Sequence, residues 1–208
     1  MYECRKCEQF GLTYKRAHRP QEYIEGNRDS TIWIVGLNPA FDSAWVDGVD
    51  VRTTRELQEY FDIQSGLHSY FRDFKAVSKS VYHALGKTGG IAHTDLVKCQ
   101  SNGWPPSGCT DSSGKTIIEN CMPYFVDQLR RVRPLMIICN GVPICDAMKK
   151  LVPIPAGCSP SVTSYITEFE EKRICIVLSG FIGRIDNYAK RRLGAEIEER
   201  AKELLLLS

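Results

Sequence analysis

The chain has 208 residues, of which 43% are hydrophobic and 25% charged, and its formal net charge is +2. This composition is ordinary for one globular α/β domain and excludes a disordered or fibrous chain. No apolar run approaches the roughly 20 residues that span a bilayer, and the N-terminus lacks the apolar segment of a secretory signal. We therefore expect one domain over residues 1–208, cytoplasmic, monomeric and without a membrane partner.

Nine cysteines are the unusual feature of this composition. An odd number in a chain expected inside the cell argues against a disulfide framework and favours metal binding or buried thiols. Cys139, Cys145 and Cys175 lie in or just after apolar runs, so we predict that they are buried small hydrophobic residues. Cys4 and Cys7 form a C-x-x-C pair in a polar segment without a helical or strand period. They are candidate ligands of zinc or of an iron–sulfur cluster.

The first clear element is the apolar run at residues 31–36, which leads into Leu37, Asn38, Pro39 and Ala40. A continuous apolar strand is typical of a parallel sheet that is covered on both faces. In such sheets ligands bind beyond the carboxyl ends of the strands. Asn38 therefore lies where chemistry usually occurs, although an asparagine before a proline is also typical of a plain turn.

Strands and helices then alternate along the chain. Helical patterns cover residues 53–61, 70–85, 116–132, 142–151 and 186–206, and strand patterns cover residues 91–97, 135–139 and 174–178. Thr53 or Thr54 is the expected N-cap of the first helix. The alternation predicts an α/β three-layer sandwich with a central, mainly parallel four-stranded sheet flanked by helices.

Two further cysteines stand at the boundaries of these elements, Cys99 after the second strand and Cys121 in the first turns of a helix. With the segments already described they complete four motifs, in this order: Cys4-Arg-Lys-Cys7, Gly36-Leu37-Asn38-Pro39, Leu96-Val97-Lys98-Cys99 and Glu119-Asn120-Cys121. This series, which covers nearly the whole chain, resembles the uracil-DNA glycosylase superfamily, and in particular its iron–sulfur branch.

The resemblance implies a uracil-DNA glycosylase-like fold with a structural 4Fe-4S cluster away from the reacting centre. Its ligands would be Cys4, Cys7, Cys99 and Cys121. Structural zinc on the same ligands is the alternative cofactor, since both suit thiolates. Cys109 is an alternative ligand within the long loop.

The resemblance also implies an enzyme of base excision repair, a monofunctional DNA glycosylase acting on DNA with a damaged or deaminated base. Such enzymes flip the base out of the stack and hydrolyse its N-glycosidic bond. Asn38 is expected to position the attacking water, because an amide orients water although it is a feeble base. The residues expected around the base are Gly36, Leu37, Pro39, Phe41 and Asp95.

Two departures from the iron–sulfur branch bear on catalysis and substrate. Ser179 occupies the catalytic position at which that branch carries His-Pro-Ser, so the imidazole for the leaving base is absent. Backbone N–H groups of residues 180–183, or Arg184, are expected to stabilise the leaving base instead. Asp95 stands where the family has the asparagine that reads uracil. An ionised carboxylate only accepts hydrogen bonds, so we expect Asp95 to disfavour uracil unless protonated and to favour a base with N–H donors.

A third departure is the stacking aromatic residue, which is missing near Val51. Phe41 or Trp45 is its expected substitute, although packing is the simpler interpretation of both. Basic residues that follow the last motif are predicted to contact DNA phosphates. They are Arg184, Lys190 and Arg191.

Two other functions stay open at this point. The missing histidine is compatible with an inactive or catalytically weak glycosylase-like protein that only binds nucleic acid. The modest net charge is compatible with a metal-stabilised α/β protein whose ligand is not DNA.

Overall fold

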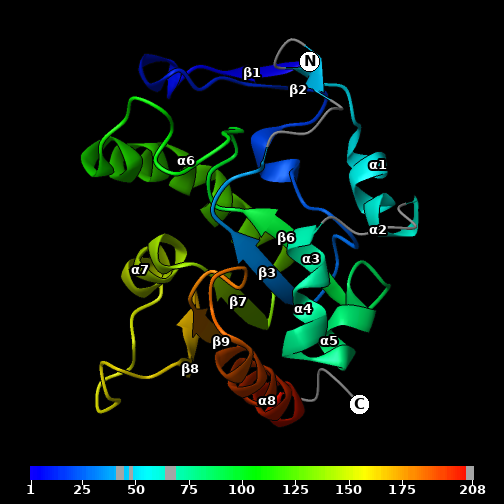
Figure 1. Ribbon diagram of the computed structural model, residues 1–208, viewed down its shortest axis with the longest axis vertical. Coiled ribbons are helices and arrows are strands. Elements are labelled where there is room, and N and C mark those ends of the chain that lie inside the picture. The colour runs from blue at the N-terminus through cyan, green and yellow to red at the C-terminus, as the bar shows by residue number, and fades with distance from the viewer. Residues whose placement is uncertain (41–44, 47–48, 64–68, 205–208) are drawn as a thin grey trace.

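The computed structural model describes residues 1–40, 45–46, 49–63 and 69–204. Its centre is a five-stranded sheet with the strand order β6-β3-β7-β9-β8 (Figure 1). In chain order, the strands of this sheet are β3 (Ile32–Gly36), β6 (Ile91–Asp95), β7 (Met136–Asn140), β8 (Ser164–Phe169) and β9 (Lys172–Ser179).

Four of these strands, β6, β3, β7 and β9, run parallel, and β8 pairs antiparallel with β9 at the edge. The prediction of a mainly parallel sheet is confirmed, but the prediction of four strands is wrong because β8 is a fifth. Only the first two residues of β8, Ser164 and Tyr165, are buried. An edge strand that is mostly half-exposed lacks the continuous apolar run that marks the inner strands.

Helices cover both faces of the sheet (Figure 1). One face packs against α6 (Asp111–Val132) and α7 (Val142–Leu151), and its core includes Trp33, Val35 and Ile137. The other face packs against the short helices α3 (Ser69–Arg72), α4 (Phe74–Val77) and α5 (Lys79–Ala84) and against α8 (Asn187–Glu203). Ile32 and Ile34 belong to this second core, because successive side chains of β3 alternate between the faces.

The helix boundaries follow local capping. Thr53 caps α1 (Thr54–Gln58), as predicted, and it also forms a capping box with Glu56; α2 (Tyr60–Ile63) follows. The pattern predicted as one helix over residues 70–85 is three short helices, because Ser78 has extended backbone (φ −156°) and starts α5 as its N-cap. Helix α6 begins at Asp111, ahead of the predicted residue 116, because Thr110 caps it.

The N-terminal segment forms a second, small sheet in the order β1-β2-β5-β4. Its strands are β1 (Tyr2–Cys4), β2 (Tyr14–Arg16), β4 (Trp45–Val46) and β5 (Val49–Asp50), with short 3-10 helices at Glu8–Phe10 and Pro20–Glu22. Strands of two or three residues are too short to display a period, which is why the sequence shows none there. Within the described part of the chain, no helix is both long and apolar enough to cross a bilayer.

Candidate functional site

Polar residues gather at the carboxyl ends of the parallel strands. Gly36, the last residue of β3, lies opposite Asp95, the last residue of β6. Asn140 and Ser179 form the corresponding pair at the ends of β7 and β9. The sheet therefore brings three predicted site residues, Gly36, Asp95 and Ser179, to the edge where ligands bind in parallel sheets.

Asn38 lies just beyond β3 and is held by the loop that follows β6. Its Nδ2 donates hydrogen bonds to the carbonyl oxygen of Ser101 at 3.0 Å, to Ser101 Oγ at 3.2 Å and to the carbonyl oxygen of Pro39 at 3.1 Å. The half-buried amide is thereby oriented, since only its nitrogen can donate. No described residue donates to Asn38 Oδ1, which leaves this oxygen as an acceptor.

The neighbours of Asn38 are fixed by backbone hydrogen bonds. The carbonyl oxygen of Leu37 accepts from the N–H of Val97 at 2.8 Å, and that of Pro39 accepts from the N–H of Ser101 at 3.2 Å. The Leu37 side chain packs into the apolar core. Leu37 and Pro39 thus hold the loop in place. Because the Leu37 side chain packs against the core, its position gives no support to the predicted contact with a base.

Three polar groups lie close to the Gly36 backbone. A Cβ atom at residue 36 would collide with Asp95 Oδ1 and would lie 3.0 Å from His93 Nε2 and 3.3 Å from the Tyr70 hydroxyl. Any other residue at this position would clash with these atoms. The glycine is therefore required by the polar cluster rather than by a turn.

Behind Asp95, a histidine and a second carboxylate continue the cluster. Glu25 forms an isolated bridge with His93 through backbone hydrogen bonds, and its Oε2 lies 2.7 Å from His93 Nδ1. His93 Nε2 lies 3.9 Å from Asp95 Oδ1. The three residues are 5% (His93), 3% (Asp95) and 7% (Glu25) exposed, so they form a buried row of alternating charge.

Burial and mutual charge set the protonation of this row. Burial lowers the pKa of His93, but Asp95 and Glu25 outweigh it, and the net shift is upward. Burial acts to raise the pKa of Glu25, but the hydrogen bond and charge of His93 outweigh it, and the net shift is downward. Glu25 and His93 therefore form an ion pair. Burial raises the pKa of Asp95 to about 6.

Tyr70 and Asn140 form a hydrogen-bonded pair next to His93. Asn140 Nδ2 donates to the Tyr70 hydroxyl at 2.8 Å, and Asn140 Oδ1 accepts from the N–H of Ile182 at 2.8 Å. The Tyr70 ring lies edge-on to His93, with centroids 5.2 Å apart, and 6.2 Å from the ring of Phe181. Burial raises the pKa of Tyr70, so its hydroxyl is neutral.

Ser179 and the loop after it were expected to stabilise a leaving base, but two of their hydrogen-bond donors are already engaged within the protein. Ser179 Oγ donates to the carbonyl oxygen of Gly180 at 2.8 Å, so its proton is engaged locally. The N–H of Ile182 is likewise engaged by Asn140. A shallow groove of about 260 Å³ runs beside Ser179 toward Cys145 and Pro160, and its lining does not include Gly36 or Asp95.

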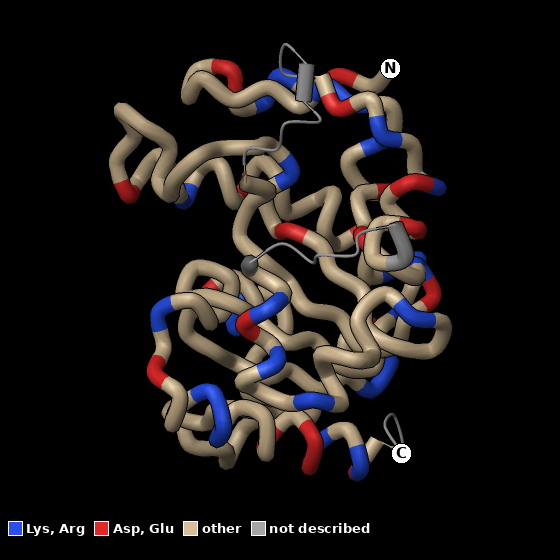
Figure 2. Tube along the Cα trace, turned by 45° about the vertical axis from the view of Figure 1, so that its right-hand side comes forward, with Lys and Arg blue, Asp and Glu red and all other residues tan. Residues whose placement is uncertain are grey.

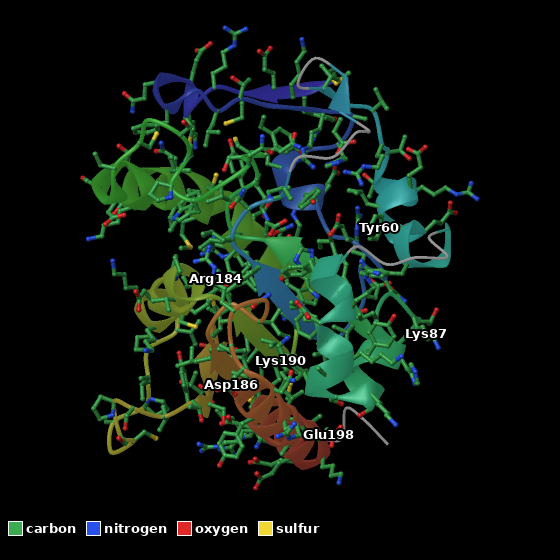
Figure 3. All side chains as sticks on the ribbon, viewed as in Figure 1. Tyr60, Lys87, Arg184, Asp186, Lys190 and Glu198 are labelled. Atoms are coloured by element: carbon green, nitrogen blue, oxygen red, sulfur yellow. The ribbon has the colours of Figure 1, made fainter. Side chains whose placement is uncertain are left out.

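The predicted DNA contacts separate into exposed and buried residues. Arg184 and Arg191 are exposed, and the Arg184 guanidinium lies 6.0 Å from the centroid of the Phe181 ring. Lys190 is only 8% exposed, and its Nζ pairs with Asp73 Oδ1 at 3.2 Å. Figure 3 shows Arg184 and Lys190 near the start of α8, and Figure 2 shows basic and acidic residues interspersed along the chain. Lys190 is thus committed to an internal ion pair rather than open to a phosphate.

Two aromatic candidates cannot be placed in the site. Phe41 lies outside the described residues, and of Trp45 only the backbone, in β4, is described.

The four cysteines of the proposed ligand set meet in one apolar cluster. Cys7, Cys99 and Cys121 are buried in it, and Cys4 packs against it. The segments they come from are β1, the start of the first 3-10 helix, the loop after β6, and α6. The cluster joins the N-terminal sheet to the main sheet. Its other buried members are Leu12, Tyr14, Val97 and Ile117.

Donors face two of the sulfur atoms. The Tyr124 hydroxyl donates to Cys4 Sγ at 3.3 Å, and Asn120 Nδ2 donates to Cys7 Sγ at 3.6 Å. Such hydrogen bonds suit thiolate ligands. The hydrogen bond with Cys121 raises the pKa of Cys7, and burial adds to it.

The remaining cysteines are more simply placed. In the described part of the chain no cysteine forms a disulfide, and no three His, Cys, Asp or Glu side chains are arranged as ligands of one metal ion. Cys109 contacts the carbonyl oxygen of Phe10 through its Sγ at 3.9 Å. Cys139, Cys145 and Cys175 are buried, as predicted.

The sequence-based prediction of the site did not include four of its residues, namely Glu25, Tyr70, His93 and Asn140. His93 had a usable signal, because it precedes Asp95 by two residues on a strand and so shares its face. Asn140 ends the third strand, as Asp95 ends the second. Glu25 lies in a segment without periodicity and carries no such signal.

Neither a scan against protein-family models nor a search of curated proteins finds a match to this sequence.

Proposed function

We propose that this protein is a monofunctional DNA glycosylase with a uracil-DNA glycosylase-like fold, which hydrolyses the N-glycosidic bond of a damaged or deaminated base. The observation that carries the proposal is the orientation of Asn38. Its Nδ2 is engaged by Ser101, and its Oδ1 remains as an acceptor just beyond the carboxyl end of β3, two residues after Gly36.

In the proposed reaction, Asn38 Oδ1 accepts a hydrogen bond from a water molecule and directs its oxygen toward C1′ of the sugar. The bond from C1′ to the base breaks, its electron pair leaves with the base, and the water oxygen bonds to C1′. The base takes up one proton and the water loses one. An amide suffices as water positioner when the bond to the base breaks early, because the sugar cation then needs no strong nucleophile.

Asp95 and Gly36 are assigned to the bound base. Gly36 and Asp95 lie opposite each other at the carboxyl ends of β3 and β6, and the Asp95 carboxylate offers an acceptor to a base. Arg184 and Arg191, which are exposed, are assigned to DNA phosphates. Lys190 is left out of this assignment because it pairs with Asp73.

The four clustered thiols are the proposed ligands of a 4Fe-4S cluster, with structural zinc as the alternative. The chemistry of the donor set fits either, because thiolates bind both. The bound group would supply a cross-link between the N-terminal sheet, the loop after β6 and α6. It takes no part in the steps above.

Single-turnover assays on oligonucleotides that each carry one modified base test this proposal. Abasic sites are detected by alkaline strand cleavage, and DNA binding is measured in parallel on single- and double-stranded forms. Formation of abasic sites by the wild type, and their loss in Asn38→Ala with DNA binding intact, is the expected result. DNA binding without abasic product would favour the nucleic-acid-binding alternative, for which the engaged hydroxyl of Ser179 is a specific argument.

A further inference from the structure

Left-handed backbone at residues other than glycine is confined to one place in the described part of the chain. Arg133 (φ 56°) is the C-cap of α6, and Glu170 (φ 46°) and Glu171 (φ 62°) form the two-residue turn between β8 and β9. Such turns favour asparagine and glycine, because a longer side chain crowds the left-handed backbone. Strain that is kept in a fold is a pointer to a functional surface.

Arg133 and Glu170 line a shallow depression of about 20 Å³, which we call the basic depression. A volume of this size takes one methyl-sized group. The floor is apolar and consists of Leu129, Pro134, Phe169 and Ile174. Ile174 and Ser179 are five residues apart on β9, so about 17 Å of strand separate the basic depression from the candidate site.

The rim of the basic depression carries four basic side chains and one carboxylate. They are Arg130, Arg133, Lys172, Arg173 and Glu170. The rim already binds a carboxylate, because Arg130 Nε donates to Glu170 Oε1 at 2.8 Å and Arg130 Nη2 lies 2.7 Å from the same oxygen. Arg173 pairs with Glu203 at 3.5 Å. Arg133 and Lys172 are exposed, and neither forms an ion pair with a described residue.

We propose that the basic depression is a docking site for an acidic peptide segment of a partner protein. The tip of one aliphatic side chain of the peptide sits on the apolar floor, and carboxylates on either side of it pair with Arg133 and Lys172. Apolar contact supplies an anchor, and charge complementarity sets the choice of partner. This inference does not rest on the proposed function.

The distribution of charge favours a peptide over a nucleic acid. Glu170 lies on the rim, Glu171 follows it in the turn, and Glu203 pairs with Arg173. A DNA duplex carries one negative charge per about 1.7 Å of its axis, so its backbone cannot avoid these carboxylates. A peptide can place its own carboxylates beside Arg133 and Lys172 alone. The apolar floor also has no counterpart in a sugar–phosphate backbone.

The test measures binding of a fluorescein-labelled peptide, Glu-Asp-Glu-Leu-Glu-Asp-Glu, to the whole protein by fluorescence anisotropy. One control peptide has glycine in place of leucine, and a second has lysine in place of every acidic residue. We expect the glycine peptide to bind at least about 5-fold more weakly and the lysine peptide not to bind. In ¹⁵N-resolved NMR spectra of the wild type, the acidic peptide should shift the amide resonances of residues 129–134 and 169–174 and leave those of residues 36–40 in place.

Two kinds of variant test the rim. Arg133→Glu combined with Lys172→Glu should weaken binding of the acidic peptide at least about 10-fold. Lys115→Glu combined with Lys202→Glu is the matched control, because it makes the same charge change at exposed residues away from the depression and should leave the affinity unchanged. Glu170→Asn removes the internal carboxylate from Arg130 with a residue that tolerates left-handed backbone, so affinity should rise at least about 3-fold.

The proposal is overturned if the acidic peptide does not bind, or binds the folded rim variant as tightly as the wild type. It is also overturned if Glu170→Asn weakens binding. Amide shifts at residues 129–134 and 169–174 that single-stranded oligothymidylate produces and the peptide does not would make the depression a nucleic-acid surface instead. None of these outcomes depends on whether the protein excises a base.

Discussion

Asn38 Nδ2 donates to both the carbonyl oxygen and the hydroxyl of Ser101, at 3.0 and 3.2 Å, across 63 positions of sequence. The bonds join the loop after β3 to the loop after β6, and they orient the amide so that its oxygen is the group left to act. A residue that was only a turn asparagine would not need this second loop.

The first prediction concerns this amide. Asn38→Ala should lower the single-turnover rate of base excision by at least about 100-fold, because the attacking water loses its only proposed positioner. DNA affinity should stay within a factor of about two. Ser101→Ala is the matched variant, since it removes one hydroxyl contact and keeps the carbonyl contact, and its rate should fall less than about 10-fold. Equal rates for Asn38→Ala and wild type would reject the assignment.

The second prediction concerns the close approach of Gly36 to Asp95. Gly36→Ala puts a methyl group against Asp95 Oδ1 and His93 Nε2, so excision should be lost and the free energy of unfolding should fall by about 1–3 kcal/mol. Gly103→Ala is the control, because a Cβ there meets no atom within 4 Å. Denaturant unfolding and the excision assay measure the two effects. An active, fully stable Gly36→Ala variant would show that neither the fold nor excision requires a glycine beside Asp95.

The third prediction is a pH dependence of stability. Burial raises the pKa of Asp95 from 3.8 to about 6; the charge of Glu25 acts in the same direction, and the charges of His93, Lys98 and Arg16 oppose it. Between these values the folded state binds the Asp95 proton and the unfolded state does not, so this group's contribution to stability falls as pH rises through the window.

Asp95→Asn removes that ionisation. The variant should therefore melt at a higher temperature than wild type above pH 6, and the difference should shrink as the pH is lowered toward 4. Thermal unfolding in a pH series measures this. A variant less stable than wild type at pH 7.5 would mean that the ionised carboxylate is favourable in the fold.

The fourth prediction separates two kinds of basic residue around α8. Arg184→Gln and Arg191→Gln should weaken DNA binding and reduce the slope of log affinity against log salt by about one each. Lys190→Met should leave the slope unchanged and lower the melting temperature instead, because it breaks the pair with Asp73. A salt slope that changes in Lys190→Met alone would reverse the assignment.

The fifth prediction concerns the four clustered thiols. Anaerobically purified protein should be brown, with visible absorption and about four irons per chain if a 4Fe-4S cluster is bound. Cys121→Ser should lose the colour and melt at a lower temperature. Cys158→Ser, at an exposed cysteine outside the cluster, should keep both. Colourless protein with one zinc per chain would establish the alternative metal, and protein without either metal would reject the ligand set.

The inner strands were predictable because both of their faces are buried, so residues 31–36 and 135–139 read as continuous apolar runs. The strands β1, β2 and β8 were not, because they are short or half-exposed. Within the site, Asn38 and Asp95 were predictable from their place at strand ends. Glu25 was not, since only the folded chain brings it to His93, through an isolated bridge and a side-chain contact of 2.7 Å.

The difference in exposure between Lys190 and Arg191 illustrates a second limit of prediction from sequence. A run of basic residues reads as one charged surface in the sequence, but helix α8 turns its successive side chains in different directions. Lys190 points to Asp73 and is buried, whereas Arg191 is exposed. Charge alone does not tell a phosphate contact from an internal ion pair.

The most direct test of the central claim is chromatographic and mass-spectrometric detection of the base released from duplexes that each contain one damaged or deaminated base. We predict that wild-type protein releases free base in a 1:1 ratio with abasic sites, and that Asn38→Ala releases at least about 100-fold less in the same time. An intact oligonucleotide after incubation with folded, DNA-binding protein, or equal release by Asn38→Ala, would contradict the account.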